Sequence, residues 1–85
     1  MMDGATFKLN IISPEKVLFE GDVLSVALPG GKEPFTVLRN HAPIISTLRK
    51  GLIRWSADVS GELAISGGFV EVKGNVVTAC VEVNA

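Results

Sequence analysis

Short segments in which apolar and polar residues alternate, separated by turn-forming residues, run through almost all of this 85-residue chain. Residues 6–12 place three apolar side chains on one face and Lys8 and Asn10 on the other, and residues 76–83 alternate in the same way. A period of two residues is that of a β-strand, and no window shows the 3.6-residue period of an amphipathic helix. Turn signals recur every roughly 8 to 12 residues, which is typical of a sandwich or barrel.

The pattern predicts one all-β domain over residues 1–85, a small sandwich or flattened barrel of about nine or ten short strands. Residues 23–28 are nearly all apolar or small, which predicts a strand buried on both faces. Gly74 and Asn75 stand between two alternating runs and predict a two-residue hairpin turn. Gly67 and Gly68 predict a bulge or a sharp bend. The segments expected to form strands are residues 6–12, 17–19, 23–28, 35–38, 44–48, 52–57, 63–65, 69–73 and 76–83.

Composition excludes several classes of protein. With 47% hydrophobic residues, 20% charged residues and a net charge of −1, the chain is not of the disordered type and lacks the basic surplus of a general nucleic-acid binder. The single cysteine, Cys80, cannot form an internal disulfide and is expected to be a small residue of the sheet or core. The N-terminus does not have the pattern of a signal peptide, and no apolar run approaches the length of a membrane span, so we expect a cytosol-facing protein.

The residues that could support chemistry are few. His41 is the only histidine, so a serine or cysteine nucleophile has one possible base, and no serine stands in a G-x-S-x-G setting. Gly30-Gly31-Lys32 is rich in glycine but does not match a phosphate-binding loop, and no helix is expected after it. We therefore expect no catalytic site, no metal and no cofactor.

A stand-alone barrel that binds nucleic acid or a ligand, similar to the oligonucleotide-binding fold, is the alternative function. Such proteins stack bases on clustered aromatic side chains in a basic groove. Four cationic residues could form a local basic patch: Arg39, Arg49, Lys50 and Arg54. The aromatic residues are spread one per strand and are therefore assigned to the hydrophobic core: Phe7, Phe19, Phe35, Trp55 and Phe69.

A surplus of apolar residues points to an interaction module. A sandwich of this size cannot bury every apolar side chain, and we expect one apolar patch to remain exposed and meet a partner. Residues 29–43 hold three prolines, two glycines and the histidine. Prolines restrict the unfolded chain, so this segment suits a stiff docking surface.

Six short motifs follow one another along the chain: Ser13-Pro14-Glu15, Pro29-Gly30, Val37-Leu38, His41-Ala42-Pro43, Lys50-Gly51-Leu52-Ile53-Arg54 and the run SGGFVEV at residues 66–72. In this order and spacing they resemble the N-terminal β-sandwich domain of the epsilon subunit of bacterial F-type ATP synthases, the counterpart of the mitochondrial delta subunit. The resemblance extends from residue 6 to the C-terminus. Each motif alone is weak, and six in register are specific.

The resemblance implies a non-catalytic rotor subunit of the central stalk, which binds the gamma subunit and the ring of c subunits and so couples proton flow to ATP synthesis. It implies a peripheral position on the cytoplasmic face of the bacterial inner (plasma) membrane, with no substrate or cofactor of its own. The resemblance also implies which residues contact gamma, by their match to the family's positions: Ser13, His41, Ala42, Pro43 and Ser46. The ring-contact residues are Gly30, Gly31, Lys32, Glu33 and Pro34.

The chain departs from the family pattern at two places. Lys32, Pro34 and Thr36 replace the usual residues of the ring-facing loop, which leaves Glu33 as its acidic side chain, and Arg39 replaces a common proline before His41. The family normally continues into a C-terminal pair of helices that in many members restrains ATP hydrolysis and in some binds ATP. The sequence ends where the sandwich is expected to end, so neither role is assigned to it.

Overall fold

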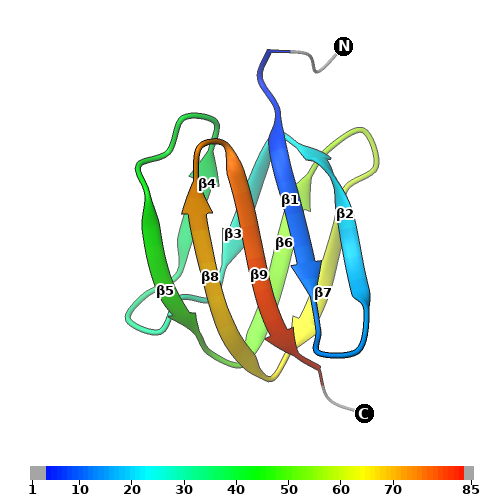
Figure 1. Ribbon diagram of the computed structural model, residues 1–85, viewed down its shortest axis with the longest axis vertical. Helices are drawn as coiled ribbons and strands as arrows, with labels where there is room; N and C mark the ends of the chain where they lie inside the picture. The colour runs from blue at the N-terminus through cyan, green and yellow to red at the C-terminus, as the bar shows by residue number, and fades with distance from the viewer. Residues whose placement is uncertain (1–3, 84–85) are drawn as a thin grey trace.

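A computed structural model describes residues 4–83, and the regular structure in that range consists of nine β-strands (Figure 1). The predicted all-β fold is confirmed. The strands are β1 (Phe7–Ile12), β2 (Val17–Val23), β3 (Ser25–Leu28), β4 (Phe35–Leu38), β5 (Ile44–Leu48), β6 (Gly51–Ser56), β7 (Gly61–Ile65), β8 (Gly67–Lys73) and β9 (Val76–Glu82). Within residues 4–83 there is no helix with the length and apolar character needed to cross a membrane.

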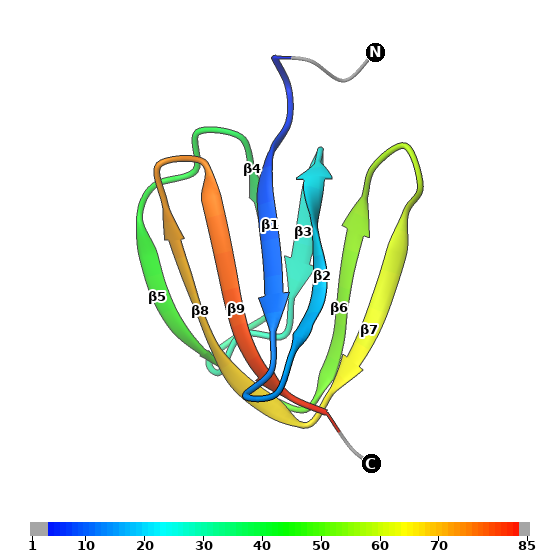
Figure 2. The ribbon, with the colours of Figure 1, turned by 45° about the vertical axis from the view of Figure 1, so that its right-hand side comes forward.

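The strands form two sheets that face each other (Figure 2). The five-stranded sheet has the order β2-β1-β9-β8-β5, and the four-stranded sheet has the order β4-β3-β6-β7. Neighbouring strands are antiparallel except β1 and β9, which are parallel. Because β1 and β9 are the first and last strands, their pairing joins distant parts of the sequence in the middle of one sheet.

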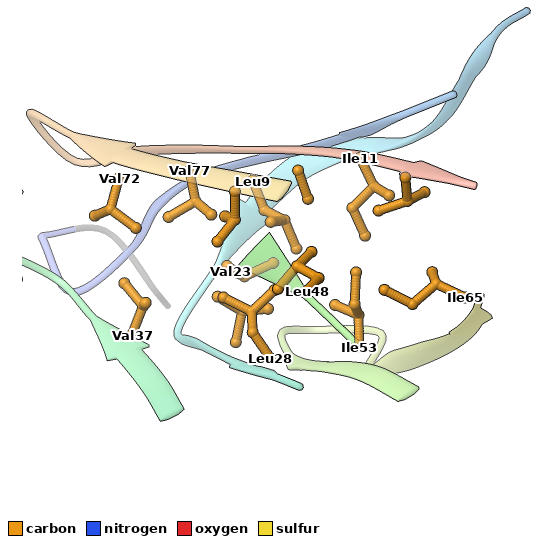
Figure 3. Packing of buried hydrophobic residues seen from close by; sticks show 14 of the residues in the cluster. Leu9, Ile11, Val23, Leu28, Val37, Leu48, Ile53, Ile65, Val72 and Val77 are labelled. Atoms are coloured by element: carbon orange, nitrogen blue, oxygen red, sulfur yellow. The ribbon is translucent and has the colours of Figure 1, made fainter. Parts of the chain in front are cut away.

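The core lies between the two sheets and is entirely hydrophobic over the described residues (Figure 3). Leu9, Ile11 and Val77 enter it from the five-stranded sheet, and Leu28 and Ile53 enter it from the four-stranded sheet. Alternate residues of these strands face outward, as expected where each sheet is covered on one side only.

The prediction of one strand over residues 23–28, buried on both faces, is wrong. The chain leaves the five-stranded sheet after Val23 and enters the other sheet at Ser25, and the N–H of Leu24 donates to the carbonyl oxygen of Ser56 at 2.7 Å. In β3, Val26 is buried while Ala27 is half-buried, because the outer face of the four-stranded sheet has no further layer over it.

Two predictions about glycines are confirmed. Gly74 and Asn75 have φ angles of 58° and 63°, which suit the two-residue turn that joins β8 and β9. At Gly67 and Gly68 the chain bends from β7 in one sheet to β8 in the other. Gly68 has a φ of 146°, and a Cβ atom there would overlap the carbonyl oxygen of Cys80, so the close approach of β8 and β9 requires glycine.

Candidate partner-binding surfaces

The connections between strands gather at two opposite ends of the sandwich (Figure 1). We call the head the end that holds residues 39–43 and the Gly74–Asn75 turn, and the foot the end that holds residues 13–16 and 29–34. The five expected gamma-contact residues are therefore not side by side. His41, Ala42 and Pro43 lie at the head, Ser13 lies at the foot, and Ser46 lies within β5 between them.

Ser13 holds the turn between β1 and β2. Its hydroxyl oxygen accepts from the N–H of Glu15 at 3.3 Å and from the N–H of Lys16 at 3.2 Å, and its own N–H donates to the carbonyl of Lys16 at 2.9 Å. These bonds are those of a serine-capped turn. The geometry favours a turn-shaping role for Ser13, with the half-buried side chain accessible only in part.

His41 is half-buried, and one ring nitrogen, Nδ1, lies 2.7 Å from the carbonyl oxygen of Ala42. A carbonyl oxygen can only accept, so Nδ1 carries the proton and, in the neutral ring, Nε2 is left as an acceptor. The N–H of His41 donates to the carbonyl of Leu38 at 3.2 Å, while Ala42 and Pro43 are exposed. The head therefore offers a partner two small apolar residues beside one imidazole nitrogen.

Ser46 faces the inside of the sandwich. It is paired in register with the buried Val70 of β8, and its hydroxyl donates to the carbonyl of Thr47 at 2.8 Å. β5 is an edge strand of its sheet. Another subunit could contact Ser46 only by reaching around this edge.

The expected ring-contact segment, residues 30–34, is fastened to β5 at the foot. Gly30 is buried and bridges to Leu48, and the N–H of Gly31 donates to the carbonyl of Thr47 at 2.9 Å. The side chains that reach solvent from this segment are those of Lys32, Glu33 and Pro34. The segment thus presents one positive and one negative charge on a tethered loop.

An exposed apolar strip crosses the outer face of the five-stranded sheet. Register places Ile12, Cys80 and Phe69 side by side on three adjacent strands, β1, β9 and β8. Ile45 on β5 lies opposite Glu71 and is therefore the diagonal neighbour of Phe69. Phe69 is 53% exposed and Ile45 is 77% exposed. We call these four residues, Ile12, Cys80, Phe69 and Ile45, the outer strip.

A hollow of about 420 Å³ continues the outer strip to the foot. Its walls include Ile12, Phe69 and Cys80 of the strip together with Ser13 and Pro14 of the β1–β2 turn. At the other end of the strip, Ile45 lies two residues after Pro43. The strip therefore runs from the Ser13 turn at the foot towards the His41 loop at the head, and a single partner laid along it could reach both.

Phe69 and Ile45 were not predicted from the sequence as surface residues. Of the five aromatic residues assigned to the core, only Phe7 is fully buried, and Phe69 is the one that points outward. The signal was present, because Phe69 shares its side of β8 with Glu71, while Val70 and Val72 occupy the buried side. The expected exposure of apolar side chains is confirmed for Phe69 and Ile45, and that a partner meets them stays a prediction.

The four cationic residues that could have formed one basic patch are separated. Arg39 is at the head, where its Nη1 donates to the carbonyl of Thr6 at 2.8 Å, whereas Arg49 and Lys50 are at the foot. Arg54 lies on the outer face of the four-stranded sheet, with its Nε 3.5 Å from Glu62 Oε1. Over residues 4–83, no three His, Cys, Asp or Glu side chains are grouped as metal ligands would be.

Residues 6–84 match the family described as ATP synthase, Delta/Epsilon chain, beta-sandwich domain. The ATP synthase epsilon chain of Leptospira interrogans is 38% identical over 78 residues, covering 91% of this chain and 61% of its own length. That of Chlorobium limicola is 42% identical over 71 residues, covering 81% of each chain. That of Desulfitobacterium hafniense is 45% identical over 74 residues, covering 86% of this chain and 56% of its own.

Solved structures share the fold. A chain of the mitochondrial ATP synthase of Euglena gracilis, in a structure of OSCP, F1 and c-ring, superposes with a TM-score of 0.84 at 21% identity, covering 93% of this chain and 54% of its own. A chain from the central stalk and c-ring structure of the Tetrahymena thermophila enzyme superposes with a TM-score of 0.74 at 15% identity, covering 88% and 62%. This chain spans less than two thirds of the length of both solved chains. It also spans less than two thirds of the Leptospira and Desulfitobacterium relatives.

Proposed function

Because this chain belongs to the family of ATP synthase delta and epsilon β-sandwich domains, we propose that it is a non-catalytic subunit of the central stalk of a proton-translocating ATP synthase. In this role it binds the gamma subunit and the c-ring and passes rotation between them. It sits peripherally on the cytoplasmic face of the bacterial inner membrane, held there by the complex. A stiff sandwich of two sheets suits this work, because the part must transmit force and has no substrate to turn over.

The observation that carries the proposal is the outer strip. Phe69 and Ile45 are large apolar side chains that remain in solvent although the core between the sheets is filled. Exposed aromatic and aliphatic side chains beside a hollow are typical of a protein-binding surface. A gamma subunit lying along the strip would reach the Ser13 turn and the His41 loop together, which is compatible with the expected contact residues at both ends of the sandwich.

The c-ring is assigned to the foot, through Lys32, Glu33 and Pro34. These side chains are exposed, and the backbone that carries them is bonded to β5 through Gly31 and Leu48. A tethered loop transmits torque better than a free one, since less of the applied force is lost in loop motion. The two glycines act by shape, because a side chain at Gly31 would overlap Thr47 of β5 and one at Gly30 would overlap Glu33 and Phe35.

The experiment is a calorimetric titration of this chain with the gamma subunit of the same complex, repeated with two serine variants. We expect Phe69→Ser to weaken binding by about tenfold or more, since a buried aromatic anchor at an interface contributes about 1.4 kcal/mol or more. Val59→Ser is the matched control, because Val59 is 82% exposed in the β6–β7 connection, away from the strip. Its affinity for gamma should equal that of the unmodified chain.

Equal affinity of Phe69→Ser and the unmodified chain would remove the outer strip from the interface. Absence of any binding to gamma, with the fold intact, would contradict the stalk assignment unless a preassembled complex of gamma and c-ring restores binding. An oligonucleotide titrated in parallel tests the alternative function. A nucleic-acid-binding barrel would bind it with an affinity that falls steeply with salt, whereas the stalk subunit should give no signal.

A further inference from the structure

Residues 39–43 cross from β4 in the four-stranded sheet to β5 in the five-stranded sheet, and two asparagines hold this crossing at the head. The N–H of Asn40 donates to Oδ1 of Asn75 at 2.6 Å, and Nδ2 of Asn75 donates to Oδ1 of Asn40 at 3.0 Å. The two residues are 35 positions apart in the sequence. We call this reciprocal pair the asparagine clamp.

Both asparagines of the clamp have an unusual backbone conformation. Asn40 and Asn75 are the two non-glycine residues with positive φ among residues 4–83, at 66° and 63°. Asparagine is among the residues that tolerate this left-handed conformation, and glycine adopts it freely. The carbonyl of Asn75 also accepts from the N–H of Lys8 at 3.0 Å, so its turn is fastened to β1 in addition to β8 and β9.

His41 follows Asn40 directly, so the clamp determines where the imidazole stands. The hydrogen bonds of His41 itself reach Leu38, at the end of β4 in the four-stranded sheet, and the neighbouring Ala42, and neither residue is in the five-stranded sheet. The link from this segment to the five-stranded sheet is made by Asn75, with Arg39 adding a bond to Thr6 just before β1. Without the clamp, His41 would be held to that sheet only by the bond from Arg39 to Thr6 and by the covalent continuation into β5.

We infer that Asn75 is a positioning residue for gamma binding, which acts by holding the His41–Pro43 loop in its binding conformation before gamma arrives. The inference rests on the proposed function, because it takes gamma as the partner of that loop. If a loop adopts its binding conformation only part of the time, the apparent affinity falls in proportion to the fraction of molecules in that conformation. A loop that is already ordered avoids this loss. Loss of the clamp should therefore lower the association rate constant, whereas loss of a direct contact would raise the dissociation rate constant.

Glycine substitutions test this cleanly, because glycine keeps the positive φ and removes only the side chain. Asn75→Gly removes both bonds of the clamp, Asn40→Gly removes one and keeps the N–H donor, and Asn75→Asp keeps an acceptor for that N–H. Asp58→Gly, in the exposed β6–β7 connection at the same end, is the control for added chain flexibility. Each full chain is studied by amide hydrogen exchange in NMR and by the kinetics of binding to immobilised gamma.

We expect Asn75→Gly to speed exchange of the Asn40 amide about tenfold or more and to lower the association rate constant for gamma about tenfold, with the dissociation rate constant unchanged. Asn40→Gly and Asn75→Asp should give intermediate association rates, and Asp58→Gly should match the unmodified chain. This graded order of association rates, with partial rescue by aspartate at position 75, would support a positioning role for Asn75.

Unchanged exchange at Asn40 in Asn75→Gly would show that the clamp does not hold the loop and would overturn the inference. Faster exchange at Asn40 with an unchanged association rate constant would also overturn the inference. The same holds if only the dissociation rate constant changes. If the unmodified chain does not bind gamma at all, the proposed function fails, and the exchange measurement still decides whether the clamp orders the loop.

Discussion

Gly68 and Gly67 are neighbours in β8, and the structure predicts opposite effects when each is replaced by alanine. At Gly68, φ is 146°, and a Cβ atom would overlap the carbonyl oxygen of Cys80 and lie 2.9 Å from the Cα atom of Val81. At Gly67, the nearest atom to an added Cβ is the carbonyl oxygen of Leu48 at 3.7 Å, which is an ordinary contact.

The magnitude for Gly68→Ala follows from two costs. A side chain in this region of φ costs about 1–3 kcal/mol, and moving β9 away from the new methyl group weakens at least one ladder hydrogen bond, which adds about 1–2 kcal/mol. We expect the free energy of unfolding to fall by about 2–5 kcal/mol. A chain of this length has a total of about 4–13 kcal/mol, so the variant would lose a large share of its stability.

Gly67→Ala should be neutral or stabilising by about 0.5–1 kcal/mol, because alanine loses less conformational entropy in a strand than glycine does. Urea unfolding of both variants can be followed by the fluorescence of Trp55, whose ring lies 4.4 Å from that of Phe19, and by circular dichroism. The slope against urea should stay the same, so the midpoints report stability. A loss below about 1 kcal/mol for Gly68→Ala, or equal losses at both positions, would refute the reasoning.

Two further substitutions test the core and the foot. Ile53→Ala removes most of a fully buried side chain and should lower the free energy of unfolding by about 2–5 kcal/mol in the same urea assay; a loss below about 1 kcal/mol would mean that the core collapses around the gap. Glu33→Lys reverses the exposed acidic charge of the ring-contact segment and should reduce ATP synthesis driven by a proton gradient in vesicles that carry the whole complex, with Lys32→Glu as the converse charge change. Full coupling in Glu33→Lys vesicles would exclude a role for that carboxylate at the ring.

Most strands could be predicted from the sequence because the period of side-chain exposure is a local property. The alternation of Phe7, Leu9 and Ile11 with Lys8 and Asn10 located β1 and its buried face, and the pair Gly74–Asn75 located the last hairpin. The prediction failed at Val23 and Leu24, where the chain changes sheets. The apolar run continues through that point, so the sequence carries no mark of the change.

The residues of the candidate site remain a prediction from the motifs, and their layout could not be predicted from the sequence. The motifs led to Ser13 and His41 one by one, but the pairing of β1 with β9 and of β8 with β5 puts these residues at opposite ends of one sheet. The same pairings assemble the outer strip from four strands, and they bring Asn75 to Asn40 across 35 positions of sequence. Except for Phe69 and Cys80, which the hairpin at Gly74–Asn75 brings together, these neighbours lie on segments that are distant in sequence.

The β-strand character of the chain, the buried face of strands such as β1 and β9, and the family could all be recognised from the amino-acid order alone. Those properties depend on neighbours one to a few residues apart, whose order is written in the chain. The folded arrangement was needed to see which outward-facing residues of distant strands lie together, that Ile45 is a diagonal neighbour of Phe69, and how the His41 loop is held. These depend on strand order and register, which are set by burying the whole core at once and not by any single segment.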